Sequence, residues 1–376
     1  MTRPEFDLWI AAFRQRARRA GIAERVLRDA LAELTPAASV IEKDRNQAEF
    51  TRPVWDYLDT AVSEERVDTG GMALAANAAL FARIESRFAI PREIIAAIWG
   101  IETNFGAIRG AEPVVPALAT LAWDGRRAAF FEGELLAALK ILQAGDVSRE
   151  RMLGSWAGAM GHTQFMPSTY FDHAVDFDGD GRRDIWGDDP SDALASAASY
   201  LSAAGWNEGV RWGAEARLSD GFELSLTGRQ TWKPVREWQA LGMALRESDA
   251  LSAAEPAAIL LPAGHSGPAF CISRNFEVLR RYNASDAYVL AVLLLADRLA
   301  GRGALQGTWP RALRLPDRAQ LAELQRRLTE VGFDTQGADG LAGPNTAAAI
   351  RAYQRAHALP ADGFATLDLL DRMRKR

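Results

Sequence analysis

Apolar residues recur at helical spacing through the first half of the chain, and this pattern constrains the fold more than any other feature of the sequence. Near the N-terminus the spacing joins Phe6, Trp9 and Phe13. Such a period predicts helices that bury one face. Two passages rich in glycine and aspartate, 156–168 and 176–189, interrupt the helical pattern. We therefore expect a helical unit in which these two loops are the places to look for function.

The segment 206–275 has a different pattern. Short runs at 214–217, 222–226, 230–232 and 258–261 read as strands that are separated by turns. Helical spacing then resumes at Asn275. We infer a small β-rich insertion within a mostly helical domain.

The chain length and the positions of glycine and proline predict the domain organisation. The chain has 376 residues, of which 48% are hydrophobic, enough for a sizeable core and more than one domain. Glycines and prolines between 301 and 316 indicate a linker. We expect a first domain at 1–305, with its β-rich insertion at about 206–275, and a second domain at 316–376. The expected fold class is α+β, mostly α.

The C-terminal tail contains a half-repeat. The run Leu324 to Arg327 is followed by Asp339-Gly340, and the similar run Tyr353 to Ala356 is followed by Asp362-Gly363. Short helices that alternate with Asp-Gly turns suit a three-helix module. From Pro316 onward the tail has nine basic and eight acidic residues. This balance argues against an electrostatic nucleic-acid module.

Composition excludes several classes of function. The net charge is -5, and no basic run is interleaved with aromatic residues, so nucleic acid is not an expected partner. The single cysteine, Cys271, forbids an internal disulfide. The longest apolar run, 288–296, is too short to span a bilayer. No apolar segment of the kind that a secretion signal needs follows Met1.

One carboxylate stands inside an apolar helical pattern. Pro91 reads as a helix start, and Gly106 is the expected C-cap. Glu102 lies four residues after Ile98 and three after Trp99. We therefore expect its side chain on the buried stripe of this helix.

The expected environment of Glu102 suits acid catalysis. Burial and the negative end of the helix dipole both raise the pKa of a carboxyl group, so the side chain is expected to hold a proton near neutral pH. A protonated, partly buried glutamate is what a general acid acting on a poor leaving group requires. The alternative is a glutamate at a helix end that is solvated or paired with an arginine.

Three motifs carry a resemblance to a known family. They are GIETNFG at 100–106, GAMGHTQFMPS at 158–168 and DFDGDG at 176–181. In order and spacing, over nearly all of residues 1–300, the chain resembles the B-type lytic murein transglycosylases. The tail is similar to the common peptidoglycan-binding module of cell-wall enzymes. Both resemblances point to the same polymer.

The resemblance implies a lysozyme-like fold and a reaction. The reaction is cleavage of the β-1,4 bond between N-acetylmuramic acid and N-acetylglucosamine, with Glu102 as the sole general acid and base. The acid protonates the glycosidic oxygen while the N-acetyl group of the substrate assists departure. The same group then takes the proton of the C6 hydroxyl, which closes onto C1. The implied product is a 1,6-anhydromuramoyl end, formed without water.

The resemblance also implies a set of residues that bind the glycan. They are Tyr57, Arg126, Arg127, Ser155, Gln164, Tyr200, Tyr282, Asn283 and Tyr288. Aromatic faces with polar tips suit sugar rings, and guanidinium groups suit the lactyl carboxylate or the stem peptide. Alternatives remain for each type. A tyrosine is more often a core residue, Gln164 can be a loop amide, and the two arginines can form surface salt bridges.

The aspartate-rich loop predicts a metal site. Its start reproduces the opening of an EF-hand calcium loop, but Gly187 stands where the closing glutamate is expected. The resemblance implies that a later aspartate closes a longer loop around a structural calcium ion. The predicted ligands are Asp176, Asp178, Asp180, the carbonyl of Arg182 and Asp192, with Asp188 and Asp189 as rivals for the last. The alternative is an Asp-Gly turn without metal.

The remaining expectations follow from the implied substrate. The expected partner is the peptidoglycan glycan strand, other cell-wall enzymes are further candidates, and no organic cofactor is expected. Because peptidoglycan lies outside the cytoplasmic membrane, the expected location is the periplasm. Two rival functions stay open: a muramidase that hydrolyses the same bond with water, and a non-catalytic peptidoglycan-binding scaffold.

Overall fold

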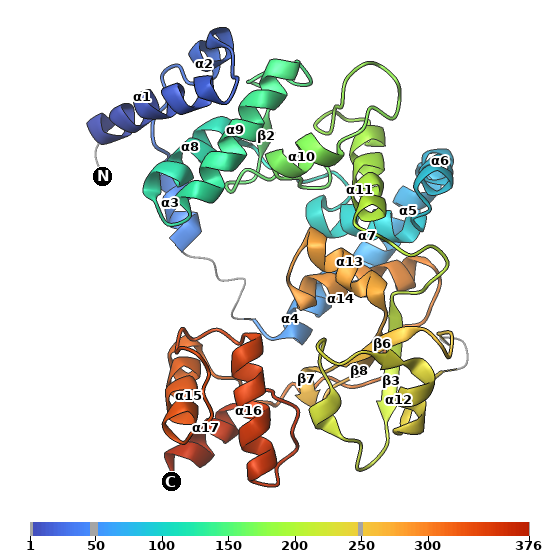
Figure 1. Cartoon of the computed structure of the whole chain (residues 1–376). Coiled ribbons are helices and arrows are strands. Elements are labelled where there is room, and N and C mark those ends of the chain that lie inside the picture. Colours follow the sequence, from blue (N-terminus) through green and yellow to red (C-terminus); the bar gives the residue numbers. More distant parts are fainter. Residues whose placement is uncertain (1–2, 46–51, 247–250, 376) are drawn as a thin grey trace. The chain divides into compact units, whose positions relative to one another are not determined.

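The computed structural model describes residues 3–45, 52–246 and 251–375. Within these residues the chain forms two compact units (Figure 1). The first draws its residues from Met1–Ala48, Ser63–Ala204 and Leu295–Gly301. The second draws its residues from Glu49–Val62, Gly205–Leu294 and Arg302–Arg376.

The first unit is almost entirely helical. Its helices are α1 (Arg3–Arg19), α2 (Glu24–Ala30), α3 (Ala38–Arg45), α5 (Glu64–Ala76), α6 (Ala78–Phe88), α7 (Arg92–Thr103), α8 (Val114–Asp124), α9 (Ala128–Ala144), α10 (Pro167–His173) and α11 (Ser191–Ala203). Two short strands, β1 (Glu112–Pro113) and β2 (Leu153–Gly154), pair antiparallel. The predicted helical character of this part of the chain is confirmed.

Helix α7 is the most deeply buried element around the predicted acid. Residues Ile94 to Gly100 are all buried, and the helix packs against α5, α6 and α11. The apolar stripe predicted from the sequence therefore lies in the core. A helix that is buried on several sides is rigid, which fixes the residues of its last turn.

The second unit contains the β-rich segment. Its elements are α4 (Val54–Ala61), β3 (Gly213–Leu218), β4 (Lys233–Pro234), α12 (Val235–Ala240), β5 (Met243–Leu245), β6 (Pro256–Leu260), β7 (Pro262–His265), β8 (Ala269–Ile272), α13 (Arg274–Tyr282), most of α14 (Asp286–Leu299), α15 (Arg318–Glu330), α16 (Pro344–Ala356) and α17 (Leu367–Arg374). Five of the strands form an antiparallel sheet in the order β4-β6-β8-β3-β5. The predicted β-rich insertion is confirmed.

Two predicted strands are wrong. Residues 230–232 belong to no strand, since β4 begins only at Lys233. Residues Leu224–Leu226 form a short 3-10 helix instead of part of a strand at 222–226. The side chain of Glu223 accepts a hydrogen bond from the backbone N–H of Ser225 at 3.1 Å. This local cap offers the backbone an alternative to sheet pairing, which explains why the apolar alternation misleads.

The C-terminal module has the three helices that the half-repeat predicts. Helices α15, α16 and α17 enclose an apolar cluster in which Leu324, Ile350 and Leu370 are almost fully buried. The module therefore has a core of its own. Among the described residues of the whole chain, no helix combines the length and apolar character that crossing a membrane requires.

The half-repeat has a structural explanation in two buried glutamines. Gln325 accepts a hydrogen bond from the N–H of Gly340 at 2.8 Å and donates to Asp339 Oδ1 at 3.1 Å. Gln354 accepts from the N–H of Gly363 and donates to Asp362 Oδ1, both at 2.8 Å. Each glutamine therefore holds one Asp-Gly turn against its own helix.

We expect the change Gln354→Leu to destabilise the chain because it leaves the Gly363 N–H and a carboxylate oxygen of Asp362 without these partners. A buried polar group that loses its partner costs about 1–3 kcal/mol. Chemical denaturation followed by fluorescence should show a lower midpoint for the transition that includes the module.

Gln239→Leu is the matched control, because Gln239 is exposed on α12. An equal effect of the two changes, or no effect of Gln354→Leu, would contradict this account of the turn.

Candidate active site

Glu102 lies in the last turn of α7, and its side chain is half-buried. Buried residues precede it on the helix, among them Ile95, Ile98 and Trp99. Helix α7 begins at Arg92, and Pro91 is the residue before it. The buried helix thus presents a carboxyl group at its C-terminal end, where the negative end of the helix dipole lies.

The end of α7 differs from the predicted one. The C-cap is Asn104, with φ of 50°, and not Gly106. Three consecutive residues have positive φ, namely Asn104 at 50°, Phe105 at 57° and Gly106 at 85°. Asparagine tolerates this left-handed region better than most residues, so it ends the helix before the glycine is reached. The chain turns sharply directly after the helical turn that carries Glu102.

The unusual conformation of Phe105 folds its ring back onto α7. A Cβ atom on Gly100 would lie 2.6 Å from Cζ of Phe105, and one on Gly70 of α5 would lie 2.9 Å from the same atom. The ring also meets Trp99 edge to face at 5.8 Å between ring centroids. Gly100 of the motif and Gly70 of α5 therefore make room for the Phe105 ring next to α7.

Thr103 joins this helix end to the glycine-rich loop. Its hydroxyl donates a hydrogen bond to the backbone carbonyl of His162 at 2.7 Å and accepts one from the N–H of Gly106 at 3.0 Å. Both Thr103 and His162 are buried. The loop that follows Gly158 is consequently fixed next to the residue that follows Glu102 in the chain.

His162 was not predicted from the sequence, yet it makes most of the contacts at this junction. The Trp99 indole N–H donates to Nδ1 of His162 at 3.1 Å, so Nδ1 carries no proton. A neutral ring then has its proton on Nε2, which lies 2.8 Å from the carbonyl oxygen of Gly187 and 3.0 Å from Nη1 of Arg109. Burial is the largest influence on the pKa of His162 and lowers it, and the nearby Arg109 charge lowers it further. The imidazole is therefore a neutral bridge.

Arg109 is a second residue that the sequence did not single out. Its guanidinium donates to the carbonyl of Gly187 and to Asp188 Oδ1, the latter at 2.9 Å. The bond with Arg109 lowers the pKa of Asp188. The only sequence signal for either residue was its place within or between the two glycine-containing motifs.

Gln164 lies in the loop that the junction fixes, and Ser155 comes just before that loop. Gln164 has φ of 51°, and its amide donates to the carbonyls of Arg109 at 3.2 Å and Gly161 at 2.9 Å. Ser155 Oγ accepts from the N–H of Ala159 at 3.1 Å. Both side chains thus shape the loop, and both are half-buried. Their contact with glycan stays a prediction.

Arg126 and Arg127 lie at the start of α9 and are exposed. Arg126 donates to the backbone carbonyl of Asp44 at 2.7 Å and lies 3.4 Å from its carboxylate. The guanidinium of Arg127 lies over the rings of Phe130 and Phe131, at 4.9 and 4.7 Å from their centroids. The structure thus gives Arg126 the ion pair that was the alternative, whereas the glycan contact of both arginines stays a prediction.

The predicted tyrosines divide between the two units. Tyr200, on α11 of the first unit, is half-buried and meets His173 edge to face at 4.8 Å between ring centroids. Tyr57, Tyr282, Asn283 and Tyr288 belong to the second unit. Tyr282 and Tyr288 stack at 6.5 Å with an angle of 7° between their planes, and Tyr288 is buried. Of the predicted glycan-binding tyrosines, the structure therefore brings Tyr282 and Tyr288 together.

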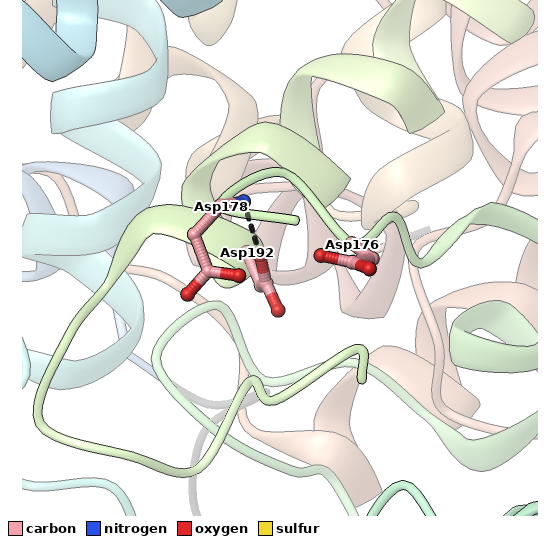
Figure 2. Close-up of side chains that lie close together, drawn as sticks. All are labelled: Asp176, Asp178 and Asp192. Carbon is pink, nitrogen blue, oxygen red and sulfur yellow. Dashed lines mark hydrogen bonds between the residues drawn. The ribbon is translucent and has the colours of Figure 1, made fainter. Parts of the chain in front are cut away.

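The aspartate loop gathers three of its predicted ligands. Oxygen atoms of Asp176, Asp178 and Asp192 all lie within 4.8 Å of one another, and Figure 2 shows the three carboxylates side by side. Asp180 is not in this group, and its Oδ1 accepts from the N–H of Arg182 at 2.8 Å. Among the described residues this is the one such cluster of three acidic, histidine or cysteine side chains.

Asp192 is the buried member of the cluster. It accepts hydrogen bonds from the N–H groups of Phe177 at 2.7 Å and Asp184 at 2.8 Å, and from that of Asp178 at 3.4 Å (Figure 2). Burial is the main cause that raises the pKa of Asp192, and the charge of Asp178 adds to it. The two alternatives to Asp192 as the last ligand have other partners. Asp188 pairs with Arg109, and Asp189 accepts a hydrogen bond from the N–H of Ser191.

Comparisons with known proteins agree with this geometry. Residues 5–297 match the family described as "Transglycosylase SLT domain", and residues 317–373 match the "Putative peptidoglycan binding domain". The two matches fall on either side of the predicted linker.

Solved structures of similar proteins agree with the family match. The structure of SltB3 from Pseudomonas aeruginosa in complex with NAG-anhNAM-pentapeptide is 48% identical, covers 98% of this chain and 99% of that one, and has a TM-score of 0.94. The Escherichia coli lytic transglycosylase Slt35 in complex with calcium is 30% identical over 80% of this chain and 93% of that one, with a TM-score of 0.67. The expected lysozyme-like fold is confirmed by these relatives.

A curated relative is the membrane-bound lytic murein transglycosylase B of Escherichia coli. It is 36% identical over 216 residues, which are 57% of this chain and 58% of that protein. The chain thus spans less than two thirds of the length of this relative. The family match at residues 5–297 covers well over half of the present chain. The chain therefore belongs to the transglycosylase SLT domain family.

Proposed function

We propose that the chain is a lytic transglycosylase of peptidoglycan that cleaves the β-1,4 bond between N-acetylmuramic acid and N-acetylglucosamine. The observation that carries the proposal is the half-buried Glu102 at the fixed end of a buried helix, beside a glycine-rich loop. Family membership supports it. The ligand of the similar SltB3 structure, NAG-anhNAM-pentapeptide, contains an anhydro sugar, as the reaction product would.

Glu102 acts first as an acid and then as a base in this proposal. It protonates the glycosidic oxygen, and the N-acetyl group of the substrate stabilises the positive charge that develops at C1. The carboxylate then removes the proton of the C6 hydroxyl, and that oxygen forms the new bond to C1. The proton that Glu102 gave is thereby recovered, and the glycan ends in a 1,6-anhydromuramoyl group.

A rigid helix end suits this double role. The carboxyl group of Glu102 must reach the leaving oxygen first and the C6 hydroxyl afterwards. A displaced side chain would therefore fail in one of the two steps. Thr103, His162 and Phe105 hold the backbone on the far side of Glu102. The proposal assigns these three residues a positioning role and no contact with substrate.

We expect Glu102→Gln to lower the rate of glycan cleavage by about a thousandfold or more, because an amide neither gives nor takes the proton. Release of soluble muropeptides from purified sacculi measures the rate. Glu93→Gln, at the first turn of the same helix, is the matched control and should keep full activity.

Mass spectrometry of the released muropeptides separates the rival reactions. Anhydro ends indicate cyclisation, whereas reducing ends indicate a hydrolytic muramidase. Undiminished lysis by the Glu102→Gln variant would refute the role of this residue, and the absence of any cleavage by the unaltered chain would favour a binding scaffold.

We infer that the aspartate cluster holds a structural calcium ion. Three carboxylates with oxygens within 4.8 Å of one another are the hard ligands that calcium prefers. A cation there would also relieve the burial of the Asp192 charge. The similar Slt35 structure was determined in complex with calcium. Asp180 and the carbonyl of Arg182 complete the predicted ligand set.

Calcium is expected to raise the thermal stability of the first unit, because it binds the folded loop and not the unfolded chain. At a hundred times the dissociation constant the gain is about 2.7 kcal/mol. Thermal unfolding in calcium chloride and in a chelator measures the difference, which should amount to several degrees.

Asp178→Asn tests the site with little risk to folding, because Asp178 is exposed. This variant should lose most of the calcium response, whereas Asp172→Asn, an exposed aspartate on α10, should keep it. An equal response in both variants would place the ion elsewhere.

We propose that residues 317–373 attach the enzyme to the cell wall and that it acts in the periplasm. The family match of this segment and its separate apolar core support the attachment. The isolated segment 316–376 should therefore sediment with purified sacculi and stay in solution without them. Failure to sediment would reduce the module to a packing element.

A further inference from the structure

The second unit holds a cavity of about 390 Å³ whose walls are rich in arginine. Its lining residues are Arg229, Gln230, Trp232, Arg274, Glu277, Arg280 and Arg281. All of them lie between residues 205 and 294 and so belong to one compact unit. No residue with a proposed role in catalysis or in calcium binding is among them.

The polar face of α13 supplies one wall of this cavity. Arg274, Glu277 and Arg281 recur at intervals of three and four residues, which places them on one side of the helix. The opposite side carries Phe276 and Leu279, which are fully buried. The positions of Arg274 and Arg281 therefore follow from the packing of α13.

Two of the arginines are held in place by carboxylates. Arg229 lies 3.3 Å from both Glu277 and Asp286, and Arg280 lies 2.6 Å from Asp286. The side chains of Arg229 and Arg280 are only 21% and 22% exposed. Such a network fixes the two arginine side chains before a ligand binds. Binding then costs less side-chain conformational entropy.

Arg274 is held in a different way. Its guanidinium carbon lies 3.7 Å from the centroid of the Trp232 ring, and the indole N–H of Trp232 donates to the carbonyl of Arg229 at 2.8 Å. Within the described part of the chain, Arg274 forms no ion pair. The aromatic face orients the guanidinium without neutralising it, so its N–H groups can still bind an anion.

The cavity is consequently positive in an acidic chain. Arg229 and Arg280 share the carboxylates of Glu277 and Asp286, so the guanidinium of Arg274 is in excess of them, whereas the net charge of the whole chain is -5. This local excess favours a ligand with negative charge. Guanidinium forks match the planar carboxylate group, and Gln230 adds a neutral amide that suits a peptide backbone.

We propose that this cavity binds the free carboxylates of a peptidoglycan stem peptide. The inference rests on the proposed function, which makes peptidoglycan the substrate. The stem peptide is the part of that polymer that carries several carboxylates close together. The similar SltB3 structures contain ligands with a pentapeptide, so a peptide of this kind is bound by a relative.

The test uses the free stem pentapeptide, without sugar, and the full-length chain. Isothermal titration should show binding of the pentapeptide, and conversion of its carboxyl groups to amides should abolish it. Arg274→Ala should weaken binding about fivefold or more, as loss of one charge-assisted contact predicts. Arg236→Ala, an exposed arginine on the neighbouring helix α12, should leave binding unchanged.

Two results would overturn the proposal: equal binding of the peptide and its amide, or equal binding by the Arg274→Ala variant and the unaltered chain. Thermal unfolding of each variant checks that the fold is kept, and the amide comparison needs no variant at all. Release of anhydro muropeptides from purified sacculi by the unaltered chain is measured in parallel. Because that product tests the proposed function directly, its formation without binding of the free pentapeptide would mean that this inference alone has failed.

Discussion

The hydrogen bonds around His162 are the constraint on which the candidate active site depends. Trp99 and Thr103, both on α7, bind the ring and the backbone carbonyl of this residue. The bond from Trp99 requires an imidazole whose Nδ1 carries no proton. A proton on Nδ1 would face the indole N–H of Trp99, and two donors would then oppose each other. Burial keeps the ring neutral because it lowers the pKa of His162, and the hydrogen bond from Trp99 then favours the Nε2–H tautomer.

Regular elements of this fold could be predicted from periodicity. The stripe from Ile94 to Trp99 predicts a buried helix, and the half-repeat predicts the three helices of the C-terminal module. Both rest on spacing that a buried face imposes on the sequence. The cluster of Asp176 and Asp178 with the more distant Asp192 came from family resemblance, since alternating aspartates alone do not indicate which later carboxylate approaches them.

Irregular backbone could not be predicted in the same way. It is held by individual side-chain contacts, and these impose no regular spacing on the sequence. Asn104 ends α7 two residues before the expected glycine. Glu223 caps a turn where alternation suggested a strand. No spacing in the sequence singles out His162, although a Cβ atom on Gly106 would lie 2.6 Å from its ring. In each case the decisive contact is either a local cap or a long-range one that sequence spacing does not encode.

The aspartate cluster and the helix of Glu102 are connected through a short series of hydrogen bonds. Asp192 accepts from the N–H of Asp184, whose carboxylate accepts from the N–H of Gly187 at 2.9 Å. The carbonyl of Gly187 in turn meets His162, which binds the end of α7. A cation that fixes Asp192 would therefore limit the positions open to Gly187 and His162. Its effect on catalysis would act through the backbone next to Glu102, without any contact with the reacting bond.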